Sequence, residues 1–145
     1  MPRVTKGAPL DSGARVHKSK GLPDDLVRFS FKYFYDTAKF GCHAVPEGMR
    51  EPYWVAFMER LKAISSMTIN EFRGGRGRAL KIHTHKWDHT SEPDGFTQLN
   101  AQLRDYEPWQ FCIDRSNYGR VHGFILDEIF YVIWIDPQHQ LYPVE

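Results

Sequence analysis

The sequence lacks the features that would assign it to a membrane-spanning or disulfide-rich class. No apolar run approaches the roughly eighteen residues of a membrane-spanning helix, and the N-terminus has no apolar block typical of a signal peptide. The chain has two cysteines, Cys42 and Cys112, which fits a reducing compartment in which neither needs to be bridged. These absences predict a cytoplasmic protein with no membrane contact.

Several enzyme signatures are also absent. The segment "GGRG" at residues 74–77 lacks the preceding strand and the following helix of a phosphate-binding loop, and no dinucleotide fingerprint occurs. Paired Cys-x-x-Cys and His-Glu-x-x-His patterns are missing, and neither cysteine stands in a Cys-His-Asn context. We therefore expect no cofactor and no bound metal, and any catalysis would depend on ordinary side chains.

The overall charge gives no support to nucleic-acid binding, because the net charge is +1 at pH 7. Residues 1–23 hold five of the 19 Lys and Arg but one of the 18 Asp and Glu, which leaves 14 basic and 17 acidic residues for positions 24–145. Residues 1–24 are also rich in Gly, Pro and Ser, which predicts a flexible basic arm outside the fold. Binding to RNA would have to depend on local clusters of charge.

Periodicity predicts one strand and two helices in the first half of the fold. Alternating apolar residues predict a strand over residues 26–35, and apolar residues at three- and four-residue spacing predict a helix over 51–67. The apolar face of that helix would consist of Trp54, Phe57, Met58, Leu61 and Ile64. A short helix over 68–72 is expected to begin at Thr68, with Glu71 completing a capping box.

The C-terminal part predicts a three-strand antiparallel meander over residues 108–117, 120–126 and 129–135. The last two strands flank a two-residue hairpin loop, Asp127–Glu128. The segment 129–135 is apolar at nearly every position, so we expect it to be the central strand, covered on both faces. The segment 79–87 is predicted as either a short strand or an extended loop.

Together these elements predict a single α+β domain over residues 25–145. Its sheet would be small and antiparallel, made of the C-terminal three-strand meander plus the N-terminal strand and packed by two helices. Residues 73–108 would form an insertion between the second helix and the meander, with a brief helix at 97–106.

The meander has a recognisable order of features in "WQFCIDRSNYGRVHGFILDEIFYVIWI", residues 109–135. An aromatic and apolar strand leads through a short turn to a strand that opens with Arg, and a very apolar strand follows. This pattern, with the element order over roughly residues 27–143, resembles the RelE/ParE superfamily of bacterial toxins, which includes ribosome-dependent messenger-RNA endonucleases and gyrase inhibitors. In this resemblance Arg120 matches the strand-opening Arg, and His139 and Tyr142 match a polar tip after the last strand.

The resemblance implies a RelE-like fold and an endoribonuclease of the mRNA interferase type, within a toxin–antitoxin or phage-defence module. Its substrate would be messenger RNA, free or bound to the ribosome, and its protein partner would be a neutralising antitoxin.

Metal-independent RNA cleavage of this type requires three chemical functions. A base takes the proton of the attacking 2′-hydroxyl, a cation offsets the charge on the phosphoryl oxygens, and an acid protonates the leaving 5′-oxygen. Histidine suits both proton transfers because its reference pKa is about 6.5, and Arg suits the phosphate because its planar fork binds two oxygens. The predicted catalytic residues are Arg120, His122, His139 and Tyr142, with His83 or His85 as an alternative general base.

Each of these residues also has a structural interpretation that the sequence leaves open. Arg120 would pair with Asp114 or Asp136 at the end of its strand. His122 would have a structural role, and His139 would be an exposed loop residue after a turn. Tyr142 would pack its ring against the edge of the sheet.

The insertion begins with the basic segment "RGGRGRALKIHTHKWDH", which contains five Lys or Arg and no acid from Arg73 to Lys86. Open backbone, positive charge and an aromatic residue suit a loop that follows an RNA backbone, although a solvated connector has the same composition. The predicted RNA-binding residues are Arg73, Arg76, Arg78, Lys81, Lys86, Trp87 and, in the turn before Arg120, Arg115.

Two other classes of function stay open. The segment "HTHKWDH" places His83 and His85 at a His-x-His spacing, with Asp88 and His89 close behind, which would suit a metal-dependent hydrolase. The four Trp, seven Tyr and ten Phe exceed the needs of one small core, so the excess would suit a non-catalytic protein-binding module with the same fold.

Overall fold

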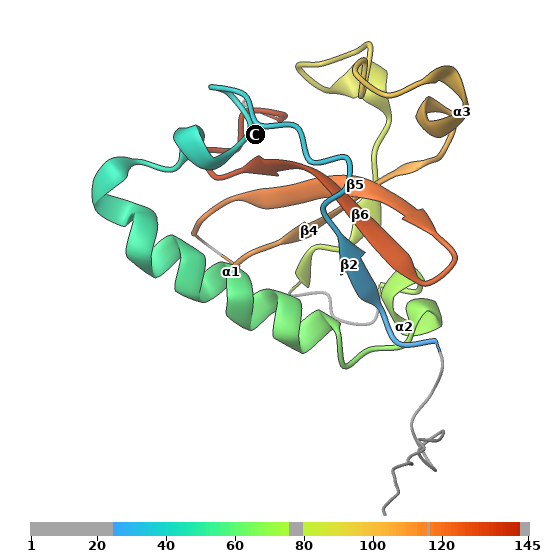
Figure 1. The fold of residues 1–145 in the computed structure, drawn as a ribbon, viewed down its shortest axis with the longest axis horizontal. Helices are drawn as coiled ribbons and strands as arrows, with labels where there is room; N and C mark the ends of the chain where they lie inside the picture. The colour runs from blue at the N-terminus through green and yellow to red at the C-terminus, as the bar shows by residue number, and fades with distance from the viewer. Residues whose placement is uncertain (1–24, 76–79, 116, 143–145) are drawn as a thin grey trace, which may run out of the picture.

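A five-stranded mixed sheet forms the middle layer of the protein in a computed structural model, which describes residues 25–75, 80–115 and 117–142 (Figure 1). The strand order is β2-β6-β5-β4-β3. The strands are β2 (Arg28–Ser30), β3 (His83–Thr84), β4 (Pro108–Cys112), β5 (Arg120–Leu126) and β6 (Ile129–Asp136). The predicted flexible arm at residues 1–24 lies outside the described residues.

Three α-helices accompany the sheet within the described residues, which confirms the α+β class. They are α1 (Arg50–Ile64), α2 (Ile69–Arg73) and α3 (Ala101–Arg104), and short 3₁₀ turns occur at Cys42–Ala44, Glu47–Met49 and Trp87–His89. The predicted start of α2 is confirmed, because the Thr68 side chain accepts from the Glu71 backbone N–H and the Glu71 carboxylate accepts from the Thr68 N–H. No helix in the described part of the chain has the length and apolar composition needed to cross a bilayer.

The prediction of an all-antiparallel sheet is wrong. β2 runs parallel to β6, with Arg28 opposite Ile129, and β3 adds a fifth strand beyond β4. A parallel pair needs a long crossover connection, and the helices and the insertion between β2 and β6 supply it. β5, rather than β6, is the middle strand.

The N-terminal strand is also shorter than predicted. β2 ends at Ser30, and a turn follows in which the Phe34 N–H donates to the Phe31 carbonyl at 3.0 Å. This turn leaves the Phe31 side chain 47% exposed, although its alternation with Val27 predicted a buried position. The alternation of buried and exposed side chains expected over residues 26–35 therefore holds only for the first residues of that segment.

Two hydrophobic cores lie on opposite faces of the sheet. The ribbon shows α1 and α2 on one side of the sheet and α3 on the other (Figure 1). α1 and α2 cover one face and form the helix-side core, which includes Tyr53, Phe57, Phe72, Phe111 and Phe130. The insertion and the segment around Phe40 cover the other face and form the loop-side core, which includes Phe40, Phe96, Phe124, Trp134 and Leu141. The aromatic residues thus fill two cores, so their number no longer indicates an interaction surface.

A β-bulge shifts the pairing of β5 with β6. The two-residue loop alone would place Arg120 opposite Ile135, as the sequence predicted. In the structure Gly123 pairs with Val132 but His122 pairs with Trp134, so Ile133 is an extra residue in β6. Arg120 consequently lies opposite Asp136.

The structure corrects the apolar face of α1. Tyr53, Phe57, Leu61 and Ile64 are buried, whereas Met58, predicted on the same face, is 61% exposed. Met58 follows Phe57 by one residue, which is about 100° around a helix with 3.6 residues per turn.

Replacing Phe57 by Ala should therefore lower the free energy of unfolding by about 3–5 kcal/mol, because a buried ring is lost and a cavity remains. Replacing Met58 by Ala should change it by about 0.5 kcal/mol or less, since the side chain is exposed in the folded protein. Urea denaturation of both variants measures the two values, and equal losses would contradict the assigned helix face.

Candidate active site

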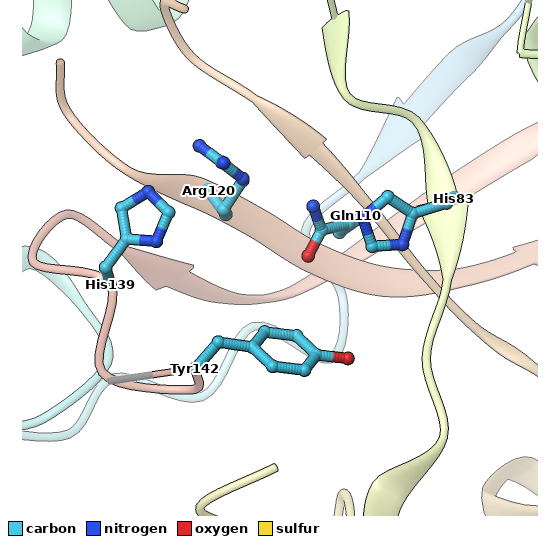
Figure 2. Close-up of a pocket in the computed structure, with 5 residues that line it drawn as sticks. All are labelled: His83, Gln110, Arg120, His139 and Tyr142. Carbon is cyan, nitrogen blue, oxygen red and sulfur yellow. The ribbon is translucent and has the colours of Figure 1, made fainter. Parts of the chain in front are cut away.

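A pocket of about 260 Å³ opens at the edge of the sheet where β5 begins and β6 ends. It is lined by His83 from β3, Gln110 from β4, Arg120 from β5, and His139 and Tyr142 from the segment after β6. Figure 2 shows His139 and Arg120 towards the left, Gln110 and His83 towards the right, and the Tyr142 ring below them. Four of the six predicted catalytic residues therefore share one pocket.

Asp136, the last residue of β6, folds the segment that carries His139 and Tyr142. Its Oδ1 accepts from the Gln140 N–H at 2.7 Å, and its Oδ2 accepts from the Leu141 N–H at 2.9 Å. Leu141 is fully buried in the loop-side core and anchors the segment there. His139 turns the chain in the left-handed region, with φ 58°.

Gly119 allows the backbone of β5 to start close to this segment. Its φ is 69°, and a Cβ atom there would lie 1.9 Å from the Asp136 carbonyl oxygen. A side chain at position 119 would therefore push β5 away from β6 at the point where the pocket forms.

Behind the pocket, a chain of hydrogen bonds joins four side chains from three parts of the fold. The Tyr142 hydroxyl lies 2.8 Å from His85 Nδ1. His85 Nε2 lies 2.9 Å from His122 Nδ1. His122 Nε2 lies 3.3 Å from Asp136 Oδ2. We call these four residues the relay; Tyr142 is its member at the pocket wall.

The two histidines of the relay are buried and neutral. His122 is 0% exposed and His85 is 5% exposed. Burial, with smaller contributions from His122 and His83, lowers the pKa of His85 to about 2. Burial also lowers the pKa of His122, against the opposing effect of its hydrogen bond to Asp136.

Asp136 is the ionised end of the relay. Burial alone would raise the pKa of Asp136, but the hydrogen bonds from His122 and from the N–H groups of Leu141 and Gln140 lower it overall. A carboxylate that accepts several hydrogen bonds holds its negative charge even at 1% exposure.

Arg120 faces the pocket rather than an acidic partner. Among the ion pairs between described residues, none joins Arg120 to Asp114 or Asp136. Its guanidinium makes a long contact of 3.4 Å with the Gly119 carbonyl. Arg120 lines the pocket, where its guanidinium would suit an anion.

The predicted RNA-binding residues do not all lie near the pocket. The Lys81 carbonyl accepts from Gln110 Nε2 at 3.3 Å, and Arg115 is exposed in the turn before β5, so both belong to the pocket end of the sheet. Arg73 instead lines a separate hollow with Ile125 and Asp127 at the hairpin end. At a rise of 3.3 Å per residue along β5, that is about 20 Å from Arg120.

The remaining members of this set have other surroundings. Lys86 is exposed next to His85. Trp87 packs into the loop-side core, with its ring centroid 4.8 Å from that of Phe96, so it is engaged in packing rather than open for stacking. Arg76 and Arg78 lie outside the described residues.

The segment "HTHKWDH" does not bring a metal-ligand set together. The His83 and His85 ring centroids are 6.1 Å apart, and both ring nitrogens of His85 already have relay partners. Asp88 and His89 are exposed. Across the described ranges, no three His, Cys, Asp or Glu side chains gather closely enough to share a metal ion.

Sequence reasoning missed two residues of the site. Asp136 was considered only as a partner of Arg120, and Gln110 was not considered. Gln110 is 2% exposed, and its Oε1 has no hydrogen-bond partner among the described residues. A polar residue inside an apolar strand such as "PWQFC" is the sequence feature that would have identified it.

Comparison with known proteins yields no match to a protein-family model, to a curated protein or to a solved structure. The RelE/ParE resemblance therefore depends on the residues quoted above and stays a prediction.

The buried histidines predict a loss of stability in mild acid. His85 stays neutral in the folded protein, whereas in the unfolded chain it binds a proton below about pH 6.5. Its contribution to stability is therefore complete above that pH and decreases as the pH falls, by about 1 kcal/mol per pH unit. Urea unfolding between pH 7 and pH 4 should show this decrease.

A matched pair of variants tests the assignment. His85→Gln removes the titrating ring while its amide can still bond to Tyr142 and His122, so it should reduce the pH dependence. His89→Gln changes an exposed histidine and should leave the dependence as in the wild type. If His85→Gln left the pH dependence of stability unchanged, His85 would not be its source.

Proposed function

We propose that this chain is an RNA endonuclease that cleaves without a metal, by attack of a 2′-hydroxyl on the adjacent phosphorus. The observation that carries the proposal is the pocket itself, which combines Arg120, two histidines and a tyrosine connected to a buried proton relay. These side chains supply the types of group that the reaction requires.

Arg120 is the phosphate-binding residue in this proposal. Its planar fork can hold two phosphoryl oxygens and offset the charge that grows on them in the transition state. His139 lies beside it on the same side of the pocket (Figure 2), where a protonated imidazole could give its proton to the leaving 5′-oxygen. His83, on the opposite side of the pocket, is the second candidate for this proton donor.

The biological setting that we propose follows the RelE/ParE resemblance: a toxin that acts on messenger RNA and is neutralised by an antitoxin. Induced expression should arrest growth and create discrete new 5′ ends in cellular RNA, mapped by primer extension. Folded Arg120→Ala, His139→Ala and Tyr142→Ala variants should relieve both effects. If all three variants remain as toxic as the wild type, the assignment of this pocket is wrong.

Arg120→Lys gives the sharpest test of the phosphate role, because it keeps the charge and removes the bidentate fork. We expect the rate of cleavage to fall on the order of a hundredfold, with RNA affinity changing much less. The matched control is Arg28→Lys, which alters an exposed Arg that pairs with Glu128 at the hairpin end. Full activity of Arg120→Lys in a single-turnover assay would reduce Arg120 to a structural role.

The charged residues at the pocket end should position RNA without selecting its sequence. Replacing Lys81 or Arg115 by Ala should weaken binding to all RNA sequences and reduce the salt dependence of the affinity by about one unit of slope each. Arg28→Ala serves as the charge-matched control at the far end of the sheet. Binding titrations at several salt concentrations measure the slopes, and unchanged slopes in both variants would remove these residues from the RNA path.

A further inference from the structure

The hydrogen bonds of the relay can all run in one direction, and the charge at its buried end decides which direction that is. A carboxylate only accepts hydrogen bonds, so the ionised Asp136 requires the proton of His122 to be on Nε2. A neutral imidazole has one N–H, which leaves His122 Nδ1 as an acceptor. His85 must then donate from its own Nε2, at 2.9 Å.

The same logic fixes Tyr142. His85 has its one proton on Nε2, so its Nδ1 is an acceptor, and the atom 2.8 Å away is the Tyr142 hydroxyl. Tyr142 therefore directs its O–H proton inward, towards His85. Tyr142 lines the pocket, so its hydroxyl oxygen is an acceptor on the pocket side of the relay.

We propose that Asp136 is a positioning residue that makes Tyr142 the proton acceptor of the pocket, acting through the two neutral histidines. The inference rests on the proposed function for the identity of the proton donor, the 2′-hydroxyl of RNA. It reverses the simpler assignment of Tyr142 as an acid.

The proton transfers balance along the chain. As O2′ forms its bond to phosphorus, the 2′-hydroxyl proton passes to Tyr142 Oη, and the original phenol proton passes to His85 Nδ1. His85 releases its Nε2 proton to His122 Nδ1, and the Nε2 proton of His122 moves towards Asp136. The P–O5′ bond breaks, and O5′ takes a proton from a histidine at the pocket rim.

The relay explains how a phenol can act as a base near neutral pH. An isolated tyrosine, with a reference pKa of about 10, holds its proton too firmly to act through its phenolate. Here the hydroxyl stays neutral because it loses one proton as it gains another. Asp136 offsets the positive charge that the transferred proton brings to the histidines.

The groups around the relay favour transient rather than permanent protonation. Arg120 from β5 and His139 from the segment after β6 face His122 and lower its pKa, while His83 from β3 does the same to His85. Among the residues that the structure describes, Asp136 is the negatively charged group that acts on His122. The imidazole rings of His85 and His122 are therefore both neutral before a substrate binds.

The direct test needs no RNA. In the wild-type protein at pH 7, ¹⁵N-detected NMR of the imidazole nitrogens should show His85 and His122 both protonated at Nε2 and unprotonated at Nδ1. Protonation at Nδ1 on both rings, or a doubly protonated His122, would overturn the inference, since either state makes Tyr142 an acceptor from His85.

A double-mutant cycle tests the consequence for cleavage. Asp136→Asn should lower the single-turnover rate on the order of ten-thousandfold, the scale known for a carboxylate that fixes a histidine tautomer. In the Tyr142→Phe background the same change should cost far less, because the route through the hydroxyl is already lost and only the hold of Asp136 on the segment with His139 remains. An equal loss in both backgrounds would show a merely structural role for Asp136.

The two proposals fail in different ways. If the NMR tautomers are as expected but the wild type cleaves no RNA, the proposed function is wrong and the relay serves another substrate. If RNA is cleaved but the tautomers are reversed, the nuclease stands and Tyr142 is not its base.

Discussion

The site depends on the hydrogen bonds that the buried carboxylate of Asp136 accepts. It holds the backbone N–H groups of Gln140 and Leu141 and the ring of His122 at once, within hydrogen-bond distances of 2.7 to 3.3 Å. An unpaired buried charge would cost several kcal/mol, so the three hydrogen bonds to the carboxylate have to be made together when the protein folds. One residue thereby shapes the segment behind β6 and sets the charge behind the pocket.

The sheet face that carries the loop-side core explains how the polar groups of the relay are accommodated in the protein interior. The insertion covers that face with the loop-side core and brings His85 between Tyr142 and His122. Without this cover His122 Nδ1 would face solvent and would lack the hydrogen bond to His85. The insertion is therefore part of the site as well as part of the core.

Local patterns predicted the elements well, because capping, helical periodicity and hairpin alternation are properties of adjacent residues. Thr68 and Glu71 start α2 as expected, and the meander strands begin where the apolar runs placed them. The first of these strands is shorter than predicted, because it ends at Cys112 rather than at residue 117. The direction of β2 and the register of Arg120 against Asp136 could not be predicted, since a distant pairing and the extra residue Ile133 decide them. The sequence selected Arg120, His139 and Tyr142 by chemistry, but nothing local shows that His85 and His122 touch.

The long sequence separations within the relay have a consequence for the order in which the protein matures during synthesis. His85 bonds across 37 residues to His122 and across 57 residues to Tyr142. A chain that emerges from the N-terminus first can assemble α1 and α2 early, but the relay closes only after its last member has appeared. The nascent sheet would therefore carry an incomplete pocket until residue 142 has emerged, and the complete pocket would then form abruptly.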